Sequence, residues 1–237
     1  MSISAKNLLP PLLDCVFSFP CPACRERLPE RRGTFCNECL AGLDFVSPPF
    51  CPGCGGSHDG VLKVCAKCLK ADTRPWSQAI SVFNMTPAVS ELVQKFKYNN
   101  NPEMARPFGV LAANILKRSG LTPDFLVPTP LHWTRAWRRG FNQSSLLCEI
   151  ISEELGVPVL YILKRTRRTR QQTRLNREER KKNLAGAFCV RGQTSIENRS
   201  ILLLDDVMTT GATLSAAANA LLAGGAREIN VLALARR

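Results

Sequence analysis

The chain has 237 residues, of which 45% are hydrophobic, and it carries a formal net charge of +13. Its length predicts one or two domains, and its hydrophobic content excludes a disordered chain. No apolar run approaches the roughly 18 residues that a membrane span requires, and the first residues lack the features of a secretory signal. We therefore expect a cytoplasmic protein with no membrane span.

The positive charge is concentrated in the second half of the chain. Residues 1–72 hold eight Lys/Arg against seven acidic residues, whereas residues 164–182 alone hold ten Lys/Arg against two glutamates. Such a segment favours a polyanionic partner, because each phosphate that it neutralises adds to the affinity. A solvated helix face and a loop that closes over an active site are the alternatives.

Four CxxC pairs come before residue 72, and their even spacing makes this segment an internal repeat. Tetrahedral zinc takes four thiolates, so the pairs predict a double zinc ribbon over 1–72 with about two structural Zn²⁺ ions. A disulfide framework does not suit a cytoplasmic chain, and a redox pair explains one CxxC rather than four. Sequential pairing is the simpler arrangement and a cross-braced one the alternative; His58 is expected to be a loop residue. The expected zinc ligands are Cys21, Cys24, Cys36, Cys39, Cys51, Cys54, Cys65 and Cys68.

Strand and helix patterns alternate after residue 72. Apolar positions with helical spacing occur within 89–96, 108–115 and 147–155. Compact apolar runs lie at 78–83, 124–128, 159–163, 185–190, 201–204 and 230–235. Buried runs separated by amphipathic helices are typical of a largely parallel sheet covered on both faces. We therefore expect one α/β domain over 73–237.

Residues 201–213 read ILLLDDVMTTGAT, a predicted strand followed by two acids and a turn rich in threonine. In an open α/β sheet, ligands bind beyond the carboxyl ends of the strands. Gly211 allows the backbone to approach an anion closely, and the alanine-rich helix that follows points its N-terminus at a phosphate. Asp205 and Asp206 would repel that phosphate, so they are assigned to sugar hydroxyls, directly or through Mg²⁺. A helix start that favours acids accounts for only one of them.

This stretch resembles the loop of the type I phosphoribosyltransferases that binds phosphoribosyl pyrophosphate (PRPP). The resemblance implies that the paired acids hold the ribose hydroxyls and that the turn wraps the 5′-phosphate. Some members carry an aspartate at the position of Thr209 that acts as acid/base toward a nucleobase, so the motif here supplies no obvious general base. The implied PRPP-binding residues are Asp205, Asp206, Val207, Met208, Thr209, Thr210, Gly211, Ala212 and Thr213.

A second stretch, VPTPLHWTRAWRRGFNQSSLL at 127–147, resembles the hallmark of the ComF family of competence-associated proteins. The KFKY at 95–98, the basic segment at 168–188 and the cysteine pairs agree with it. The resemblance implies a type I phosphoribosyltransferase fold, with a parallel sheet flanked by helices and a small hood, after an N-terminal double zinc ribbon. The implied pyrophosphate-loop residues are Thr129, Pro130, Leu131, Arg135, Arg138, Arg139, Gln171, Arg174 and Arg180.

Catalytic roles are expected for Asp205, Asp206 and His132, although a Pro-Leu-His sequence at a strand end can also be loop geometry. Trp133 and Trp137 could stack on bases or pack in the protein. The resemblance favours a PRPP-binding protein that acts with internalised single-stranded DNA and competence machinery proteins. An active phosphoribosyltransferase of nucleotide or nucleobase metabolism is the alternative, and the sequence leaves turnover open.

Overall fold

The computed structural model describes residues 20–26, 34–70, 73–98, 101–131, 140–166, 186–192 and 195–237. The chain divides into two compact units, residues 1–43 and residues 44–237. This division falls between the two copies of the cysteine repeat, whereas the predicted domain boundary at residue 72 follows the second copy. The boundary at 72 stays a prediction. Among the described helices, none is long and apolar enough to cross a membrane.

The first unit is built around its four cysteines. Cys21 and Cys36 are buried, and the Cys36 amide donates to the Cys21 Sγ at 3.4 Å. Cys36 also occupies the N-cap of the short helix α2 (Asn37–Ala41). A turn closes over the first pair, where the Arg25 amide donates to the Cys21 carbonyl and Arg25 takes a left-handed conformation with φ 63°. The fold of this unit therefore brings the cysteines together.

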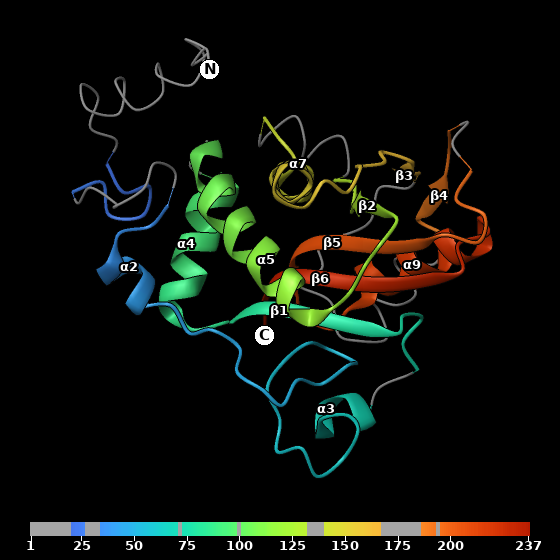
Figure 1. Cartoon of the computed structure of the whole chain (residues 1–237), viewed down its shortest axis with the longest axis horizontal. Helices are drawn as coiled ribbons and strands as arrows, with labels where there is room; N and C mark the ends of the chain where they lie inside the picture. The colour runs from blue at the N-terminus through green and yellow to red at the C-terminus, as the bar shows by residue number, and fades with distance from the viewer. Residues whose placement is uncertain are drawn as a thin grey trace, which may run out of the picture. The chain divides into compact units, whose positions relative to one another are not determined.

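A four-stranded parallel sheet forms the centre of the second unit (Figure 1). Its strands, in spatial order, are β1 (Gln78–Asn84), β6 (Glu228–Arg236), β5 (Ser200–Met208) and β2 (Phe125–Pro128). The two central strands are buried along nearly their whole length, as continuous apolar runs in a doubly covered sheet require. The predicted parallel sheet is confirmed.

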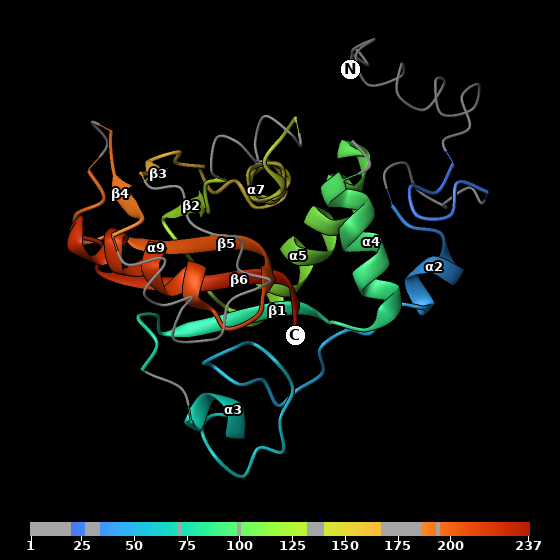
Figure 2. The ribbon, with the colours of Figure 1, turned by 180° about the vertical axis from the view of Figure 1, so that it is seen from behind.

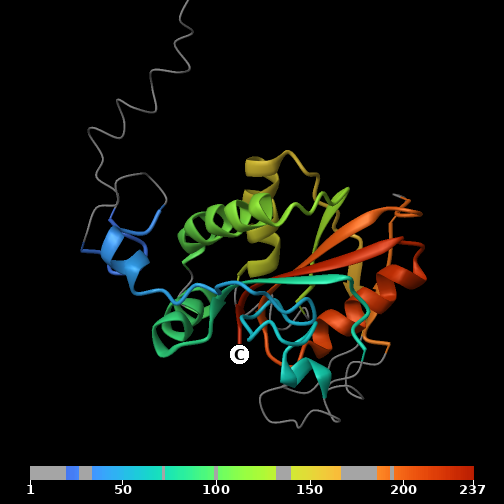
Figure 3. The ribbon, with the colours of Figure 1, turned by 60° about the horizontal axis from the view of Figure 1, so that its bottom comes forward.

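Helices cover both faces of this sheet. On one face lie α5 (Ala105–Ser119) and α7 (Gln143–Leu155), which pack against each other; α4 (Pro87–Tyr98) and the 3₁₀ turn η2 (Pro102–Met104) precede α5. On the opposite face lies α9 (Ala212–Ala223), together with the second cysteine segment and its helix α3 (Ala66–Leu69), as Figures 2 and 3 show. Cys51 and Cys54 belong to the same apolar cluster as the inner side of α9.

Two apolar runs that were expected in the parallel sheet form a separate antiparallel hairpin. β3 (Leu163–Arg165) pairs with β4 (Phe188–Val190), and β4 packs against α9. The chain at 158–160 makes one parallel bridge to the edge strand β2, through Leu126 and Val159, and then turns away. Apolar character alone does not distinguish a sheet strand from a hairpin strand that covers a helix.

β5 continues further than the apolar run that predicts it. Its pairing with β6 includes Asp205 opposite Ala233 and Val207 opposite Ala235, while β2 ends at Pro128 opposite Leu204. The two aspartates thus lie on a strand that has a neighbour on one side only. This step in the sheet places their side chains at the edge where β2 stops.

Candidate functional site

The paired aspartates lie beside the residue that follows β2. Thr129 donates from its amide to the Leu204 carbonyl at 2.8 Å and from its hydroxyl to the Asp205 Oδ1 at 2.9 Å. The same Asp205 oxygen accepts the Asp206 amide at 2.9 Å. One carboxylate oxygen is therefore fully committed to the protein. The pattern fixes the orientation of Asp205 and directs its second oxygen away from these partners.

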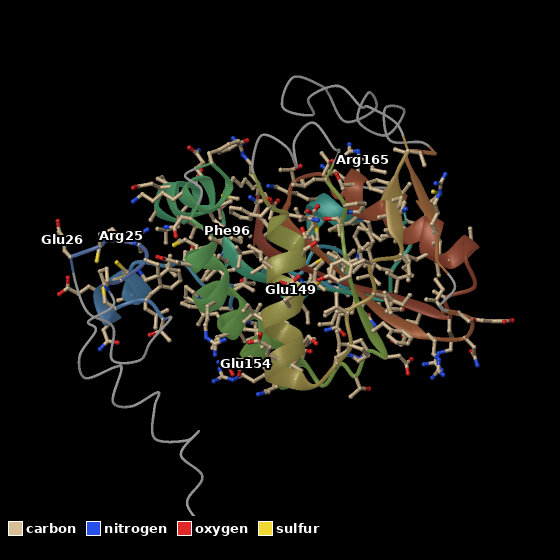
Figure 4. All side chains as sticks on the ribbon, turned by 90° about the horizontal axis from the view of Figure 1, so that it is seen from above. Arg25, Glu26, Phe96, Glu149, Glu154 and Arg165 are labelled. Carbon is tan, nitrogen blue, oxygen red and sulfur yellow. The ribbon has the colours of Figure 1, made fainter. Side chains whose placement is uncertain are left out.

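Lys97 at the end of α4 forms an ion pair with Asp206. Its Nζ lies 2.9 Å from the Asp206 Oδ1, and the two side chains are 17% and 13% exposed. Gln143, the first residue of α7, is fully buried and donates from its amide to the carbonyls of Phe96 and Lys97, at 3.3 and 3.5 Å. Figure 4 shows Phe96 on the side of α4 that faces α7. The first turn of α7 therefore holds the lysine beside the carboxylates.

The start of α7 also supports Thr129. Asn142 caps the helix by accepting the Ser144 amide at 3.1 Å, and its own amide donates to the Thr129 carbonyl at 3.0 Å. The Ser144 hydroxyl lies 3.1 Å from the Thr129 hydroxyl, which already donates to Asp205. Asn142 and Gln143 belong to the RGFNQ motif, so these two residues of the motif have a structural role here.

The pKa of Asp205 is unusually high for an aspartate. Burial, together with repulsion from the neighbouring Asp206, raises the pKa of Asp205 from the ordinary value of 3.8 to about 7. The hydrogen bond from Thr129 and the charge of Lys97 oppose this rise. Near neutral pH the carboxyl is therefore divided between its protonated and ionised forms, so that a ligand which prefers the carboxylate would shift it to that form.

The turn after β5 leads directly into the helix α9. Gly211 is in the left-handed region with φ 76° and begins α9. The Ala212 amide is bonded to the Thr210 hydroxyl at 3.4 Å, but within the described part of the chain no hydrogen bond uses the amides of Thr210 or Gly211. Amide groups at the start of a twelve-residue helix, next to hydroxyl groups, are the kind of donors that proteins use to bind phosphate.

An arginine that the sequence did not single out lies behind this turn. Arg74 donates from NH1 to the Thr210 carbonyl at 2.8 Å, and its guanidinium lies 5.2 Å from the ring centroid of Trp76. A Cβ on Gly211 would be 2.7 Å from that NH1 and 3.2 Å from Trp76. The Arg74 and Trp76 side chains therefore fill the space behind the turn. No spacing or motif in the sequence connects residue 74 with residue 210.

The described part of the chain contains some of the predicted pyrophosphate residues. Thr129 contacts Asp205 directly, and Pro130 and Leu131 follow it as half-buried residues. The remaining candidates lie outside the described residues: His132, Arg135, Arg138, Arg139, Gln171, Arg174 and Arg180. Their assignment stays a prediction, as does that of Trp133 and Trp137.

The eight cysteines form two clusters that fit structural zinc. Cys21, Cys24, Cys36 and Cys39 make one cluster, and Cys51, Cys54, Cys65 and Cys68 make the other; in each, the sulfur atoms lie within 4.8 Å of one another. Four converging thiols are the donor set of a closed tetrahedral site. The sequential pairing is confirmed. The described residues place His58 outside both clusters, where its Nδ1 accepts the Gly60 amide.

The chain is similar to competence protein F of Haemophilus influenzae, with 33% identity over 93% of this chain and 98% of that protein. It is also 33% identical to the DNA utilization protein YhgH of Escherichia coli K12, over 91% and 96% of the two chains. The competence protein ComFC of Bacillus subtilis is 28% identical over 80% of this chain and 78% of that protein.

Two family models match separate stretches of the chain. Residues 142–237 match the phosphoribosyl transferase domain, and residues 12–71 match the double zinc ribbon domain. Among solved structures, a glutamine PRPP amidotransferase of B. subtilis gives a TM-score of 0.41 at 16% identity, covering 60% of this chain and 30% of that one. Adenine phosphoribosyltransferase of Leishmania tarentolae gives 0.38 at 15%, covering 59% and 73%. At these scores the structural likeness does not by itself assign the fold.

The identity to competence protein F extends over both parts of the chain, and the two domain matches place a double zinc ribbon before a phosphoribosyltransferase domain. The predicted fold class is thereby confirmed: an α/β phosphoribosyltransferase domain with a parallel sheet and helices, and an N-terminal double zinc ribbon. The chain belongs to the ComF family of competence proteins.

Proposed function

We propose that the protein binds PRPP at the carboxyl end of β5 and acts with internalised single-stranded DNA in natural competence. One observation carries the PRPP site: Asp205 and Asp206 continue β5 past the end of β2, and the strand leads directly into a turn whose Thr210 and Gly211 amides make no hydrogen bond to any described residue. Acidic groups for a sugar diol and amides for its 5′-phosphate are thus held on adjacent residues of one element.

The ribose hydroxyls are assigned to the two carboxylates. Asp205 keeps one oxygen for the sugar while the other is bonded to Thr129 and the Asp206 amide. Asp206 is paired with Lys97, so it exchanges an intramolecular cation for the sugar when PRPP enters. Lys97 remains next to the site, where its charge would be available to the pyrophosphate.

The two carboxylates alone are too few to complete a Mg²⁺ site, so the ion is expected to bind together with PRPP. Two adjacent carboxylates offer hard oxygen ligands, and Mg²⁺ in proteins commonly uses one or two carboxylates plus phosphate oxygens and water. Asp205 and Asp206 would hold it on the protein side. When bound, Mg²⁺ supplies charge neutralisation of the diphosphate.

The pKa of Asp205 gives PRPP binding a dependence on pH. Because that pKa is raised to about 7, the carboxyl must lose a proton before it can accept hydrogen bonds from both ribose hydroxyls or bind a cation. Binding therefore strengthens between about pH 6 and pH 8. Asp205→Asn removes this component of the pH dependence, which separates it from the titration of the ligand's phosphate groups.

Transfer of the phosphoribosyl group is the second candidate, and the phosphoribosyl transferase domain match favours it. Positioning of diphosphate and acceptor would supply most of the catalysis. Thr209 offers no proton acceptor for a purine, so the acceptor must be activated by another group or be nucleophilic itself.

Release of pyrophosphate from PRPP tests which role applies. The protein is incubated with PRPP and Mg²⁺ and screened against nucleobases, ammonia and single-stranded DNA, with Asp205→Asn/Asp206→Asn as the inactive control. Release that depends on a base supports an enzyme of nucleobase metabolism. DNA binding that PRPP modulates, without release, supports the competence role.

The DNA part of the proposal rests on the names of the similar proteins and on the basic segment at 164–182. A plot of log affinity for single-stranded DNA against log salt concentration has a negative slope. If the arginines of 167–180 contact the DNA, each Arg→Ser change should make this slope shallower by about 0.7. Lys117→Ser/Arg118→Ser, at the exposed end of α5, is the control. A slope that changes no more in the arginine variants than in this control would place the DNA surface elsewhere.

A further inference from the structure

The second cysteine cluster is fixed to the core through three consecutive carbonyl groups. Pro52 accepts the Ala79 amide at 2.8 Å, Gly53 accepts the Trp76 indole N–H at 3.2 Å, and Cys54 accepts the Ser81 hydroxyl at 3.0 Å. All three carbonyls belong to the CPGC turn that carries two of the metal ligands. A metal that fixes the conformation of this turn therefore also fixes the position of the Trp76 ring.

The contact between this turn and β1 leaves no free space. A Cβ on Gly55 would come within 2.5 Å of the Ser81 amide nitrogen and 2.9 Å of the Ile80 Cα. Gly55 has φ 67°, so glycine is favoured there for its conformation as well. Trp76 is only 8% exposed, and its ring cannot shift without disturbing either the turn or the apolar cluster around it.

Arg74 links Trp76 to the turn at residues 209–213, which is called the phosphate turn below. Its guanidinium lies over the indole ring, and its NH1 donates to the Thr210 carbonyl. The carbonyl and the N–H of one trans peptide group point in opposite directions. Arg74 therefore holds the Thr210–Gly211 peptide from behind, and by doing so it directs the Gly211 amide to the opposite side.

The Arg74 side chain also brings a positive charge to the phosphate turn. Its Nε is buried and has no hydrogen-bond partner in the described part of the chain. A guanidinium that lies over an indole ring and donates one hydrogen bond to a carbonyl is restricted in orientation. Its charge lies behind the amides that would receive a phosphate and adds to their field.

We propose that the second zinc site, through Trp76 and Arg74, holds the Gly211 amide in the orientation that receives the 5′-phosphate. Arg74 is thus a positioning residue of the phosphate turn, and the second zinc ion is coupled to ligand binding rather than to folding alone. The inference rests on the proposed PRPP site and deepens it by naming what orders the site. The first cysteine cluster lies in the other compact unit.

Ligand titration of the full-length zinc-loaded protein tests the role of Arg74. In Arg74→Met, calorimetry is expected to show about tenfold weaker binding of PRPP and of ribose 5-phosphate, since a charged hydrogen bond and its orienting effect are lost. Affinity for free pyrophosphate is expected to stay within about twofold of the wild type, because the turn is assigned to the 5′-phosphate. Arg74→Lys, which keeps a donor but cannot stack in the same way, should recover part of the affinity. Equal losses for all three ligands, or none, would overturn the proposal.

Hydrogen exchange tests the connection to zinc without any ligand. The Ala212 and Ser215 amides are bonded within the turn and report on its order. In Cys68→Ser, which removes a ligand of the second cluster, these amides are expected to exchange about tenfold faster. The matched variant Cys39→Ser, at the equivalent position of the first cluster, should leave them unchanged. Equal exchange in both cysteine variants would contradict the coupling.

A third variant keeps the test decisive if Cys68→Ser does not fold. Trp76→Phe retains an aromatic ring but loses the hydrogen bond to Gly53, so exchange at Ala212 and Ser215 should rise with the zinc content unchanged. Combined with Arg74→Met, its effect on exchange should be less than additive, because both act through one contact. Additive effects would contradict the connection.

A wild type that binds neither PRPP nor ribose 5-phosphate would refute the proposed function, while the exchange results would still decide the coupling.

Discussion

The two cysteine clusters are copies of one motif with different surroundings. Cys36 and Cys65 have nearly the same backbone angles, each donates its amide to the first sulfur of its cluster, and each is the N-cap of a short helix. Arg25 and Gly55 occupy equivalent left-handed positions, with φ 63° and 67°. The first copy tolerates an arginine there, whereas the second copy contacts β1 so closely that only glycine fits.

This difference shows how a metal-binding repeat can become part of a domain core. A small metal-binding segment normally has too few apolar residues to form a hydrophobic core, so its metal stabilises the segment and not the neighbouring domain. In the second copy the carbonyls of the CPGC turn are bonded to β1 and to Trp76, and two cysteines join the cluster under α9. Loss of zinc should therefore have different consequences at the two clusters.

The largest expected contrast is between Cys51→Ser and Cys21→Ser, two residues that are both fully buried. Each variant should lose about one of about two zinc ions per chain. Only Cys51→Ser is expected to destabilise the 44–237 unit, by about 4 kcal/mol or more, which corresponds to a melting temperature lower by about 8–16 °C. Calorimetry and metal analysis measure both effects. Equal shifts would show that the clusters contribute alike.

A second contrast compares Gly55→Ala with Arg25→Ala, after which both positions hold the same residue in the same backbone conformation. At Gly55 the new Cβ meets the backbone of Ile80 and Ser81, so we expect a loss of about 3 kcal/mol. At Arg25 the left-handed conformation already holds an L-residue, so the change should be within about 1 kcal/mol. Chemical denaturation measures the free energies. A mild effect at Gly55 would mean that the second copy is not closely docked.

The smallest of these effects concerns Asp205, where the expected change is a gain. The folded-state pKa is raised to about 7, so the fold favours the protonated carboxyl; this contribution to stability is complete below about pH 4 and is lost as the pH rises through about 7. Asp205→Asn keeps an oxygen for Thr129 and the Asp206 amide but cannot ionise. It should stabilise the protein at both pH values, and by about 2 kcal/mol more at pH 8 than at pH 5, because at pH 5 the unfolded chain has already ionised this carboxyl whereas the folded protein still keeps the proton. Thermal melting at the two pH values checks this, and a gain that is the same at both would contradict the raised pKa.

Much of the fold was predictable because it depends on local patterns. The cysteine spacing indicated two metal sites, and the apolar runs gave the four parallel strands. Two features were not predictable: the pairing of β3 with β4, and the continuation of β5 through Asp205 and Asp206. Both depend on which strands pair and on how far each pairing extends. Apolar runs and charged residues do not carry that information.

Sequence motifs located individual residues of the site, but they did not predict which distant residues contact one another. The acidic pair and the threonine turn could be located in one stretch of 13 residues. Arg74 and Thr210 lie 136 positions apart, and Gln143 reaches carbonyls 46 and 47 positions away. Contacts of this kind, between a side chain and a distant backbone carbonyl, leave no composition or spacing signal in one sequence.

Titration of the full-length protein with PRPP and Mg²⁺ in a calorimeter tests the ribose-phosphate site most directly. Asp205→Asn/Asp206→Asn is expected to weaken binding by at least about 100-fold while zinc content is unchanged. Asp124→Asn, at the opposite end of β5 where its carboxylate accepts the Ser200 amide, is the matched control and should bind like the wild type. Wild-type affinity in the double variant would contradict the assignment of these two carboxylates to the sugar.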